Sequence, residues 1–337
     1  MSSYYELKNR RFIIRCMLLF GLSTCIGSSL LGLTIFLNEN TSIDERKLSL
    51  LTDCQQKLKD RDDYIFTLKT AHKPMKQNRQ KETITIFAIT PTYSRLVQKA
   101  ELTRLSQTFL HIPNFHWIVV EDSSTKTTLV ANFLKESNLN YTHLNVKTPD
   151  NYKLKPTDPN WLKPRGVLQR NLALNWLREN IDINTQKGVL YFADDDNTYS
   201  LKVFEEMRDT KVVSVWPVGL VGGLRYEKPI VENGKVVGWF THWEPKRPFA
   251  MDMAGFAINL ERIFHYKKAL FTYKVPRGYQ ESVLLKHLGV TISDLEPKAD
   301  LCTKILVWHT QTVRPKLKNE VEMKKKIGHG SDINIEL

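Results

Sequence analysis

Two kinds of hydrophobic pattern divide the chain. Residues 16–37 form one long run without a charged side chain, whereas from residue 83 onward short apolar runs alternate with longer amphipathic stretches. A long uncharged run is typical of a helix that spans a membrane, and the alternation is typical of a globular region of strands and helices. Residues 38–82, between these two regions, are polar and charged.

The alternating region predicts an α/β fold. The apolar runs predict strands at 84–90, 117–120, 141–146 and 189–193, and the amphipathic stretches predict helices from Ser94 to about 109, at 129–134 and at 167–177. Strands that alternate with helices in this order form a mainly parallel sheet with helices on both faces. Ligands bind such sheets at the carboxyl ends of the strands.

The second half of the chain is less regular. Strands are expected at 212–218, 256–260 and 304–308, and a helix at 280–287. Asn233-Gly234 lies between β-forming residues of the segment 230–240, which predicts a tight hairpin turn. A basic stretch that ends in Lys324-Lys-Lys326 reads as a solvated tail.

Three consecutive carboxylates, Asp194, Asp195 and Asp196, directly follow the apolar run 189–193. Adjacent like charges repel, so such a cluster at the end of a buried strand favours a bound cation. Carboxylate oxygens suit Mg²⁺ or Mn²⁺. A solvated acidic turn before a helix that starts near Ser200 accounts equally well for these three residues on their own.

The net charge of +13 and the pI of about 9.4 bear on the class of ligand. No zinc-finger, homeodomain or RNA-recognition pattern supports nucleic-acid binding. A basic field also concentrates small anionic substrates, such as those that carry a diphosphate and a carboxylate.

The amino-terminal region predicts membrane topology. Four basic residues, Lys8, Arg10, Arg11 and Arg15, precede the uncharged run, and acidic residues follow it. The positive-inside rule then gives a cytoplasmic tail at 1–15, a transmembrane signal anchor at 16–37, a lumenal stem at 38–82 and a lumenal catalytic domain at 83–337. A cleaved signal peptide is the alternative, but the run is longer than usual and lacks a clear cleavage site.

The stem holds Leu51, Leu58 and Ile65 at heptad spacing, with Cys54 on the same seam. A parallel coiled coil would bring two Cys54 thiols together as an interchain disulfide, and a disordered tether is the alternative. Cys302 is alone in the catalytic region and is expected as a buried free thiol. Asn40 and Asn140 begin N-glycosylation sequons.

Many motifs in the region from about residue 83 to the C-terminus resemble those of the animal β-1,3-glucuronyltransferases. They occur in the order of that family with few gaps, and they are Thr90-Pro-Thr-Tyr93, the segment 102–105, Pro164-Arg-Gly166, Gln169-Arg-Asn171, Tyr191-Phe-Ala-Asp-Asp-Asp-Asn-Thr-Tyr-Ser200, Ser214-Val-Trp-Pro-Val218, Gly222-Gly-Leu-Arg225, Trp243-Glu-Pro245, Arg247-Pro-Phe249, Asp252-Met-Ala-Gly-Phe256 and Val307-Trp-His-Thr310. The resemblance implies a GT-A glycosyltransferase fold in a type II Golgi membrane protein, with a donor half at 83–197 and an acceptor half at 198–337. It also implies a homodimer.

The resemblance assigns a UDP-sugar donor site. It makes Asp196 the direct ligand of Mn²⁺, and it places Asp195 near the ribose and Asp194 near the donor sugar. Tyr93, after Pro91, would stack on uracil, and Asp122 would accept a hydrogen bond from the base. Ordinary packing after a strand is the alternative for Tyr93.

Cationic residues would select and hold the donor. Arg165 and Arg170 can bind a carboxylate or phosphate through two hydrogen bonds, which would favour glucuronic acid, although both also read as surface arginines. The resemblance places His309 at the diphosphate. The family pattern has an arginine two residues after this histidine, where this chain has Gln311. Arg314 lies close enough in sequence to replace it.

The family's catalytic base is a glutamate after a Pro-Arg-Gly sequence, which matches Pro276-Arg-Gly278 followed by Glu281. A base is needed because the acceptor hydroxyl loses its proton as it attacks. A solvated glutamate at a helix start is the alternative. The resemblance places acceptor contacts at Glu227, Trp243, Arg247 and Asp252, and Trp243 otherwise reads as a core residue.

The reaction expected from the resemblance is the inverting transfer of glucuronic acid from UDP-glucuronic acid to O3 of a terminal galactose. Trp243 and Gly219-Leu220 resemble the branch that acts on the proteoglycan linkage region, Galβ1-3Galβ1-4Xyl, which primes heparan and chondroitin sulfate. One alternative is a relative that acts on Galβ1-4GlcNAc of glycoproteins or glycolipids. Another is a catalytically silent lumenal carbohydrate-binding protein.

Overall fold

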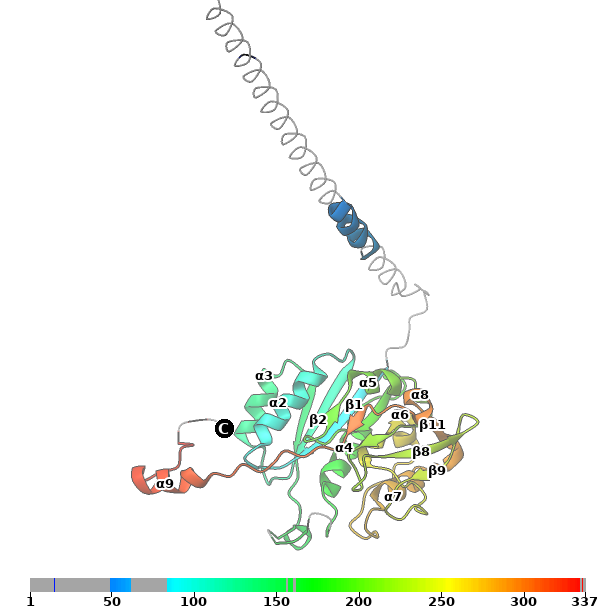
Figure 1. Cartoon of the computed structure of the whole chain (residues 1–337). Coiled ribbons are helices and arrows are strands. Elements are labelled where there is room, and N and C mark those ends of the chain that lie inside the picture. Colours follow the sequence, from blue (N-terminus) through cyan, green and yellow to red (C-terminus); the bar gives the residue numbers. More distant parts are fainter. Residues whose placement is uncertain are drawn as a thin grey trace, which may run out of the picture. The chain divides into compact units, whose positions relative to one another are not determined.

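The computed structural model describes residues 15, 49–61, 84–155, 157–159, 162–333 and 335. The chain divides into two compact units, Met1–Gln80 and Lys81–Leu337 (Figure 1). The anchor predicted at 16–37, Asn40, and Ile65 of the stem seam lie outside the described residues. Among the described residues, no helix is long and apolar enough to cross a bilayer.

In the first unit, residues 49–61 form a helix with Leu51 and Leu58 exposed and Cys54 exposed as a free thiol. The helix agrees with the heptad spacing of these residues. The coiled coil and the interchain disulfide remain predictions.

The second unit is built on a seven-stranded sheet with the strand order β11-β6-β10-β4-β1-β2-β3. Its members are β1 (Thr85–Thr92), β2 (Phe115–Glu121), β3 (Tyr141–Asn145), β4 (Gly188–Phe192), β6 (Val213–Val215), β10 (Phe256–Asn259) and β11 (Leu295–Pro297). Strand β1 runs parallel to both β2 and β4, and β10 is antiparallel to both of its neighbours. The mainly parallel sheet is therefore confirmed.

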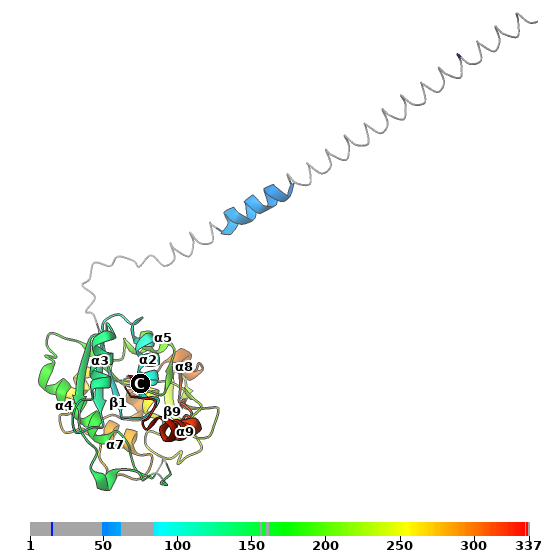
Figure 2. The ribbon, with the colours of Figure 1, turned by 90° about the vertical axis from the view of Figure 1, so that its left-hand side faces the viewer.

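Helices cover both faces of this sheet, as predicted (Figure 1, Figure 2). Side chains alternate along β1, so that Ile86 and Ala88 pack on one face while Phe87 and Ile89 pack on the other. The first face is covered by α2 (Gln98–Phe109), α3 (Thr128–Glu136) and α5 (Leu201–Met207), and the second by α4 (Val167–Asn180), α6 (Leu260–His265) and α7 (Gln280–His287).

A second, five-stranded sheet, which the sequence did not predict, has the order β5-β12-β7-β8-β9. It contains β5 (Thr198–Tyr199), β7 (Val218–Gly219), β8 (Tyr226–Glu232), β9 (Lys235–Phe240) and β12 (Val307–Trp308). The predicted hairpin is confirmed as β8 and β9, which pair antiparallel across Asn233-Gly234. Both turn residues have positive φ, 49° and 75°, as a two-residue hairpin turn requires.

Three predicted elements have the wrong extent. The helix predicted from Ser94 starts only at Gln98, because residues 93–97 form a loop that reaches the end of β4 through Arg95. The strand predicted at 212–218 is two strands in different sheets, β6 and β7, separated by Trp216-Pro217. Pro217 has no backbone N–H to donate, so strand pairing is interrupted there. The indole of Trp216 donates to the carbonyl of Ala254.

The strand predicted at 304–308 shrinks to β12, because the residues before it form a left-handed turn. All four residues of α8 (Ala299–Cys302) have positive φ, between 52° and 61°, and the N–H of Lys304 bonds back to the carbonyl of Ala299. Cys302 is a buried free thiol, as expected, and burial raises its pKa to about 12.

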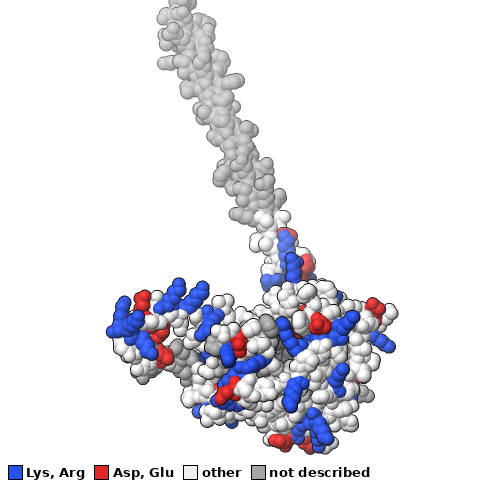
Figure 3. Space-filling model, turned by 90° about the horizontal axis from the view of Figure 1, so that it is seen from below, with Lys and Arg blue, Asp and Glu red and all other residues white. Residues whose placement is uncertain are grey.

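The remaining elements are the short helices η1 (Asp150–Tyr152), η2 (Met253–Gly255) and η3 (Ile292–Asp294), and α9 (Lys318–Ile327) in the basic tail. Figure 3 shows Lys and Arg side chains spread widely over one face of the molecule, which agrees with the net charge of +13.

Candidate active site

The carboxyl ends of β1, β2 and β4 bring the predicted donor residues to one edge of the sheet. The three strands are adjacent and parallel. The N–H of Asp122 bonds the carbonyl of Thr92 at 2.7 Å, and the N–H of Ala193 bonds the carbonyl of Ile89 at 2.9 Å. Tyr93, Asp122 and the three aspartates after β4 therefore begin at the same edge, where the sequence placed them.

The three aspartates have different surroundings. Asp194 pairs with Arg170 at 2.6 Å. Asp195 pairs with Arg95 at 2.7 Å and accepts a hydrogen bond from Thr92, also at 2.7 Å. The Asp196 carboxylate has no hydrogen-bond or ion-pair partner among the described residues. Burial, together with the charges of Asp194 and Asp195, raises the pKa of Asp196 to about 6.

A divalent cation fits this carboxylate. No cluster of three or more His, Cys, Asp and Glu side chains suitable for a metal occurs in the parts of the chain that the structure covers. Mg²⁺-type ions are commonly held by one or two carboxylates while substrate phosphates and water complete the coordination. A single unpaired aspartate whose ionised form is disfavoured by its neighbours matches that pattern, so Asp196 would hold the ion together with a phosphorylated ligand.

His309 follows β12 and reaches Asp252, which precedes η2. The imidazole Nδ1 lies 3.3 Å from Asp252 Oδ2, and the backbone N–H of His309 bonds the carbonyl of Gly219. This contact with Asp252 raises the pKa of His309 to about 9, with further contributions from Asp194 and Asp196. The imidazole is therefore cationic at neutral pH, next to the acidic cluster.

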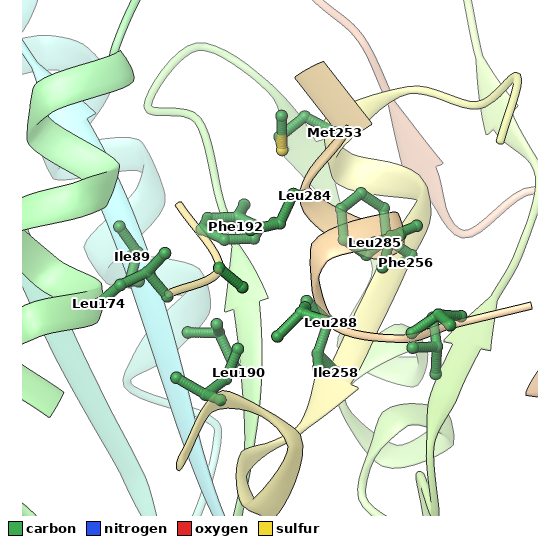
Figure 4. Close-up of a cluster of buried hydrophobic side chains, with 14 of the residues drawn as sticks. Ile89, Leu174, Leu190, Phe192, Met253, Phe256, Ile258, Leu284, Leu285 and Leu288 are labelled. Carbon is green, nitrogen blue, oxygen red and sulfur yellow. The ribbon is translucent and has the colours of Figure 1, made fainter. Parts of the chain in front are cut away.

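Glu281 lies in the first turn of α7, where the hydrophobic core fixes its position. Leu284 and Leu285 of α7 and the adjacent Leu288 pack among residues of β4 and β10, and Figure 4 shows them beside Phe192, Phe256 and Ile258. Burial raises the pKa of Glu281 to about 7, and the negative charge of Asp252 adds to this, whereas Arg247 and Arg170 oppose it. A carboxylate with such a pKa can accept a proton near neutral pH.

The loop before α7 connects Glu281 to two predicted acceptor residues. Arg247 donates a hydrogen bond to the carbonyl of Gly278, and the Arg277 guanidinium lies 4.4 Å from the centroid of the Trp243 ring. Gly278 has a φ of +70°, and a Cβ there would lie 2.9 Å from Arg247 Nη1 and 3.1 Å from Trp243 Nε1. Trp243 is 39% exposed, so it is not a core residue.

Glu227, the fourth predicted acceptor residue, is buried in β8. It accepts a hydrogen bond from Thr241, two residues before Trp243. Its strand pairs with β7, which in turn pairs with β12 before His309. The five-stranded sheet thus carries residues of both predicted subsites.

The predicted base-binding residues differ in how firmly they are held. Asp122 accepts two hydrogen bonds from Thr148, one from its N–H at 2.6 Å and one from its hydroxyl at 2.8 Å. Tyr93 is 50% exposed, which agrees better with a stacking platform than with ordinary packing. Carboxylate oxygens accept more than one hydrogen bond, so Asp122 remains able to bind a base.

Arg165 and Pro91 border Arg170. The carbonyl of Arg165 accepts a hydrogen bond from Arg170 at 2.9 Å, while the Arg165 side chain is exposed. Gly166 has a φ of +69°, and a Cβ there would meet Arg170 at 2.5 Å and Pro91 at 3.3 Å. The glycine therefore lets Arg170 reach Asp194. Direct donor binding by Arg165 remains a prediction.

Several residues near the site had been given no individual role on the basis of the sequence: Thr92, Arg95, Glu101, Arg104, Thr148 and Thr310. Thr310 and Arg104 both donate to the backbone carbonyl of Asp196, at 2.6 and 3.1 Å. Their side chains come from other elements, so no local spacing connects them with the aspartates. Gln311 and Arg314 are both exposed in the extended segment after Thr310.

Comparisons with known proteins identify the family of the chain. Residues 105–313 match the model of glycosyltransferase family 43. A rat protein named galactosylgalactosylxylosylprotein 3-beta-glucuronosyltransferase 1 is 62% identical over 239 residues, covering 70% of this chain and 71% of the rat protein. The mouse protein numbered 3 under the same name is 53% identical over 262 residues, covering 75% of this chain and 78% of its own.

The family model spans Asp122, the acidic cluster, Glu281 and His309, whereas β1 and Tyr93 precede the matched residues. The matches to the two relatives, 239 and 262 residues, are similar in length to the Lys81–Leu337 unit. The chain belongs to glycosyltransferase family 43.

Proposed function

We propose that this protein is an inverting glucuronosyltransferase that uses UDP-glucuronic acid as donor and O3 of a terminal galactose as acceptor. The observation that carries the proposal is the position of Glu281. It lies within electrostatic range of Arg170 of the donor side and Arg247 of the acceptor side, and its pKa of about 7 suits a base. The names of the relatives support the acceptor class.

The donor would lie along the edge formed by β1, β2 and β4. Tyr93 would stack on uracil, Asp122 would accept from the base, and Asp195 would accept from the ribose. Arg170, held by Asp194, offers a guanidinium to the carboxylate of glucuronic acid. Cationic His309 would face the diphosphate.

Transfer would occur in one displacement. Glu281 takes the proton from the O3 hydroxyl of galactose as that oxygen forms a bond to C1 of glucuronic acid. The bond between C1 and the UDP oxygen breaks, and its electron pair stays on the diphosphate. Attack from the face opposite the UDP inverts the configuration. Cationic His309 would stabilise the charge that develops on the diphosphate.

We propose Mn²⁺ as the metal, held by Asp196. When bound, the ion supplies electrostatic stabilisation of the leaving diphosphate without a proton donor. Asp196 suits it because its carboxylate is unpaired while both neighbouring aspartates are engaged by arginines.

The preferred acceptor is proposed to be the proteoglycan linkage region. Trp243 would pack on the apolar face of a galactose, with Glu227, Arg247 and Asp252 near its hydroxyls. The partly exposed indole, next to the loop that leads to Glu281, supports this role.

We further propose a single-pass type II protein of the Golgi membrane that forms a homodimer. The uncharged run at 16–37 with basic residues before it supports the topology. Exposed Cys54 is compatible with an interchain disulfide, and exposed Asn140 with glycosylation.

The test offers the purified protein UDP-glucuronic acid or UDP-glucose, with Mn²⁺ and either Galβ1-3Gal or Galβ1-4GlcNAc, and follows products by mass. Transfer of glucuronic acid to Galβ1-3Gal alone is expected. Transfer mainly to Galβ1-4GlcNAc would reassign the acceptor to glycoproteins or glycolipids. UDP binding without any transfer would instead indicate a carbohydrate-binding protein.

A further inference from the structure

Arg95 lies in the loop between β1 and α2 and contacts two predicted donor-binding residues. Its Nη2 lies 2.7 Å from Oδ1 of Asp195, and its Nη1 donates to the backbone carbonyl of Tyr93 at 3.1 Å. The guanidinium carbon also lies 4.5 Å from the centroid of the Tyr93 ring. One side chain therefore contacts a residue after β1 and a residue after β4.

The cluster around Arg95 is largely shielded from water. The side chains of Arg95, Glu101 and Asp195 are 15%, 3% and 8% exposed, and Glu101 also pairs with Arg95. Charge-assisted hydrogen bonds are stronger in such surroundings than at the surface. Arg95 thus has one defined position between two carboxylates.

A second chain of contacts holds Asp195 from the two residues that flank this loop, Thr92 at the end of β1 and Gln98 at the start of α2. Gln98 donates to the hydroxyl of Thr92 at 3.0 Å, and Thr92 donates to Asp195 at 2.7 Å. Because α2 begins at Gln98, residues 93–97 form a loop, and from this loop Arg95 contacts both Asp195 and Tyr93.

We propose that Arg95 is a positioning residue of the donor site, which locks the Tyr93 ring and the Asp195 carboxylate into one preformed receptor for a uridine nucleotide. The proposal rests on the proposed UDP-sugar donor. Uracil and ribose are joined by a single bond, so a platform for the base and an acceptor for the ribose must stand at a fixed separation. Holding both groups in advance lowers the ordering cost of binding.

The test measures UDP binding to the full chain in detergent by calorimetry, with Mn²⁺ present, for the wild type, Arg95→Lys and Arg95→Gln. Lysine keeps the charge but lacks the planar fork that reaches three partners. Both variants are expected to bind UDP at least about tenfold more weakly. Arg95→Gln combined with Glu101→Gln removes both members of a buried ion pair and guards against misfolding of the single variant.

Arg208→Gln is the matched structural control. Arg208 also anchors backbone, through the carbonyls of Ile84 and Pro113, but at the opposite, amino-terminal end of β1 and β2. It is expected to lower the melting temperature without changing UDP affinity. Unchanged UDP affinity in folded Arg95 variants would overturn the proposal.

A double-mutant cycle with Tyr93→Ala separates positioning from direct contact. If Arg95 acts through Tyr93, the loss caused by Arg95→Gln shrinks in the Tyr93→Ala background. Fully additive losses would mean that Arg95 does not act through the Tyr93 ring, which would refute the proposed joint positioning of Tyr93 and Asp195. A wild type that fails to bind UDP would refute the proposed function instead, so the two failures are distinguishable.

Discussion

The Nδ1 atom of His309 lies 3.3 Å from a carboxylate oxygen of Asp252, and this ion pair links the end of β12 to the start of η2. It joins a predicted donor residue to a predicted acceptor residue. Asp252 raises the pKa of His309 to about 9, and its charge also contributes to the pKa of about 7 at Glu281. We therefore expect the proposed donor and acceptor subsites to influence each other electrostatically.

The pH dependence of transfer follows from these two groups. Glu281 must be ionised to accept a proton, so activity is expected to rise through pH about 7, and His309 must be protonated, so activity falls above about 9. Asp252→Asn removes the charge that raises both pKa values, and both limbs of the profile are expected to move to lower pH.

The measurement is kcat/KM against pH for the wild type, Asp252→Asn and Asp150→Asn. Asp150 is an exposed acid paired with Lys147 and serves as the control. A uniform loss of activity in Asp252→Asn, with unchanged limbs, would limit Asp252 to acceptor binding.

Glu281→Gln is expected to abolish the proton transfer while leaving the donor site intact. The rate of transfer should fall by about 100-fold or more, since a general base contributes on that order. UDP affinity, measured by calorimetry, should stay within about twofold, a shift of less than roughly half a kcal/mol.

Glu261→Gln is the matched control, because Glu261 also lies in the first turn of a helix but is exposed and pairs with Lys187. It should retain full activity. Joint loss of UDP binding and transfer in Glu281→Gln would show that the donor and base functions are not separate.

Gln311→Arg is expected to strengthen donor binding. Gln311 directly follows Thr310, which bonds the backbone of Asp196, so a guanidinium there lies near the proposed diphosphate. A gain of roughly threefold to tenfold in UDP affinity is expected from one added charge-assisted contact.

Gln186→Arg adds the same charge just before β4, at the opposite edge of the sheet, and should not change UDP affinity. If Arg314→Gln alone weakens UDP binding in the wild type, Arg314 already fills the role of the missing arginine. In that case Gln311→Arg should gain little.

Leu301→Gly is expected to stabilise the fold. Leu301 is exposed and has a φ of 52° within the left-handed turn, a conformation that costs a residue with a Cβ about 1–2 kcal/mol. Glycine relieves this strain but loses more conformational entropy on folding, so the free energy of unfolding is expected to rise by roughly 0.5 kcal/mol.

Leu201→Gly, at the similarly exposed first residue of the right-handed helix α5, should instead destabilise the fold by roughly 0.5 kcal/mol, because glycine loses more chain entropy on folding. Urea unfolding of the two variants provides the comparison. Destabilisation by both substitutions would mean that the left-handed turn is not strained.

The sequence predicted the strand edge well because each strand carries its own signal. Asp194 directly follows an apolar run, Asp122 follows another with only Glu121 between them, and adjacent parallel strands bring their carboxyl ends together. It also placed α7 and the β8–β9 turn correctly, since helical spacing and Asn233-Gly234 are local patterns.

What the sequence could not predict depends on contacts between distant segments. Arg95 and Asp195 are one hundred positions apart, and nothing near Arg95 marks it as a partner of an aspartate. The segment 212–218 is likewise divided between two sheets at Trp216-Pro217, where the indole N–H of Trp216 donates to the carbonyl of the distant residue Ala254. The family resemblance assigns a donor role to His309 and an acceptor role to Asp252, both of which remain predictions, but it did not indicate that the two side chains pair.

The break at Trp216-Pro217 separates β6 of the seven-stranded sheet from β7 of the five-stranded sheet. The acidic cluster begins on the seven-stranded sheet, whereas Glu227 lies on the hairpin of the other sheet and Trp243 follows that hairpin. We therefore expect changes in the hairpin and the loop after it to affect the proposed acceptor contacts more than the proposed nucleotide contacts at the ends of β1, β2 and β4. Such a division would allow members of this family to differ in acceptor choice while the proposed catalytic base and donor-binding residues stay the same.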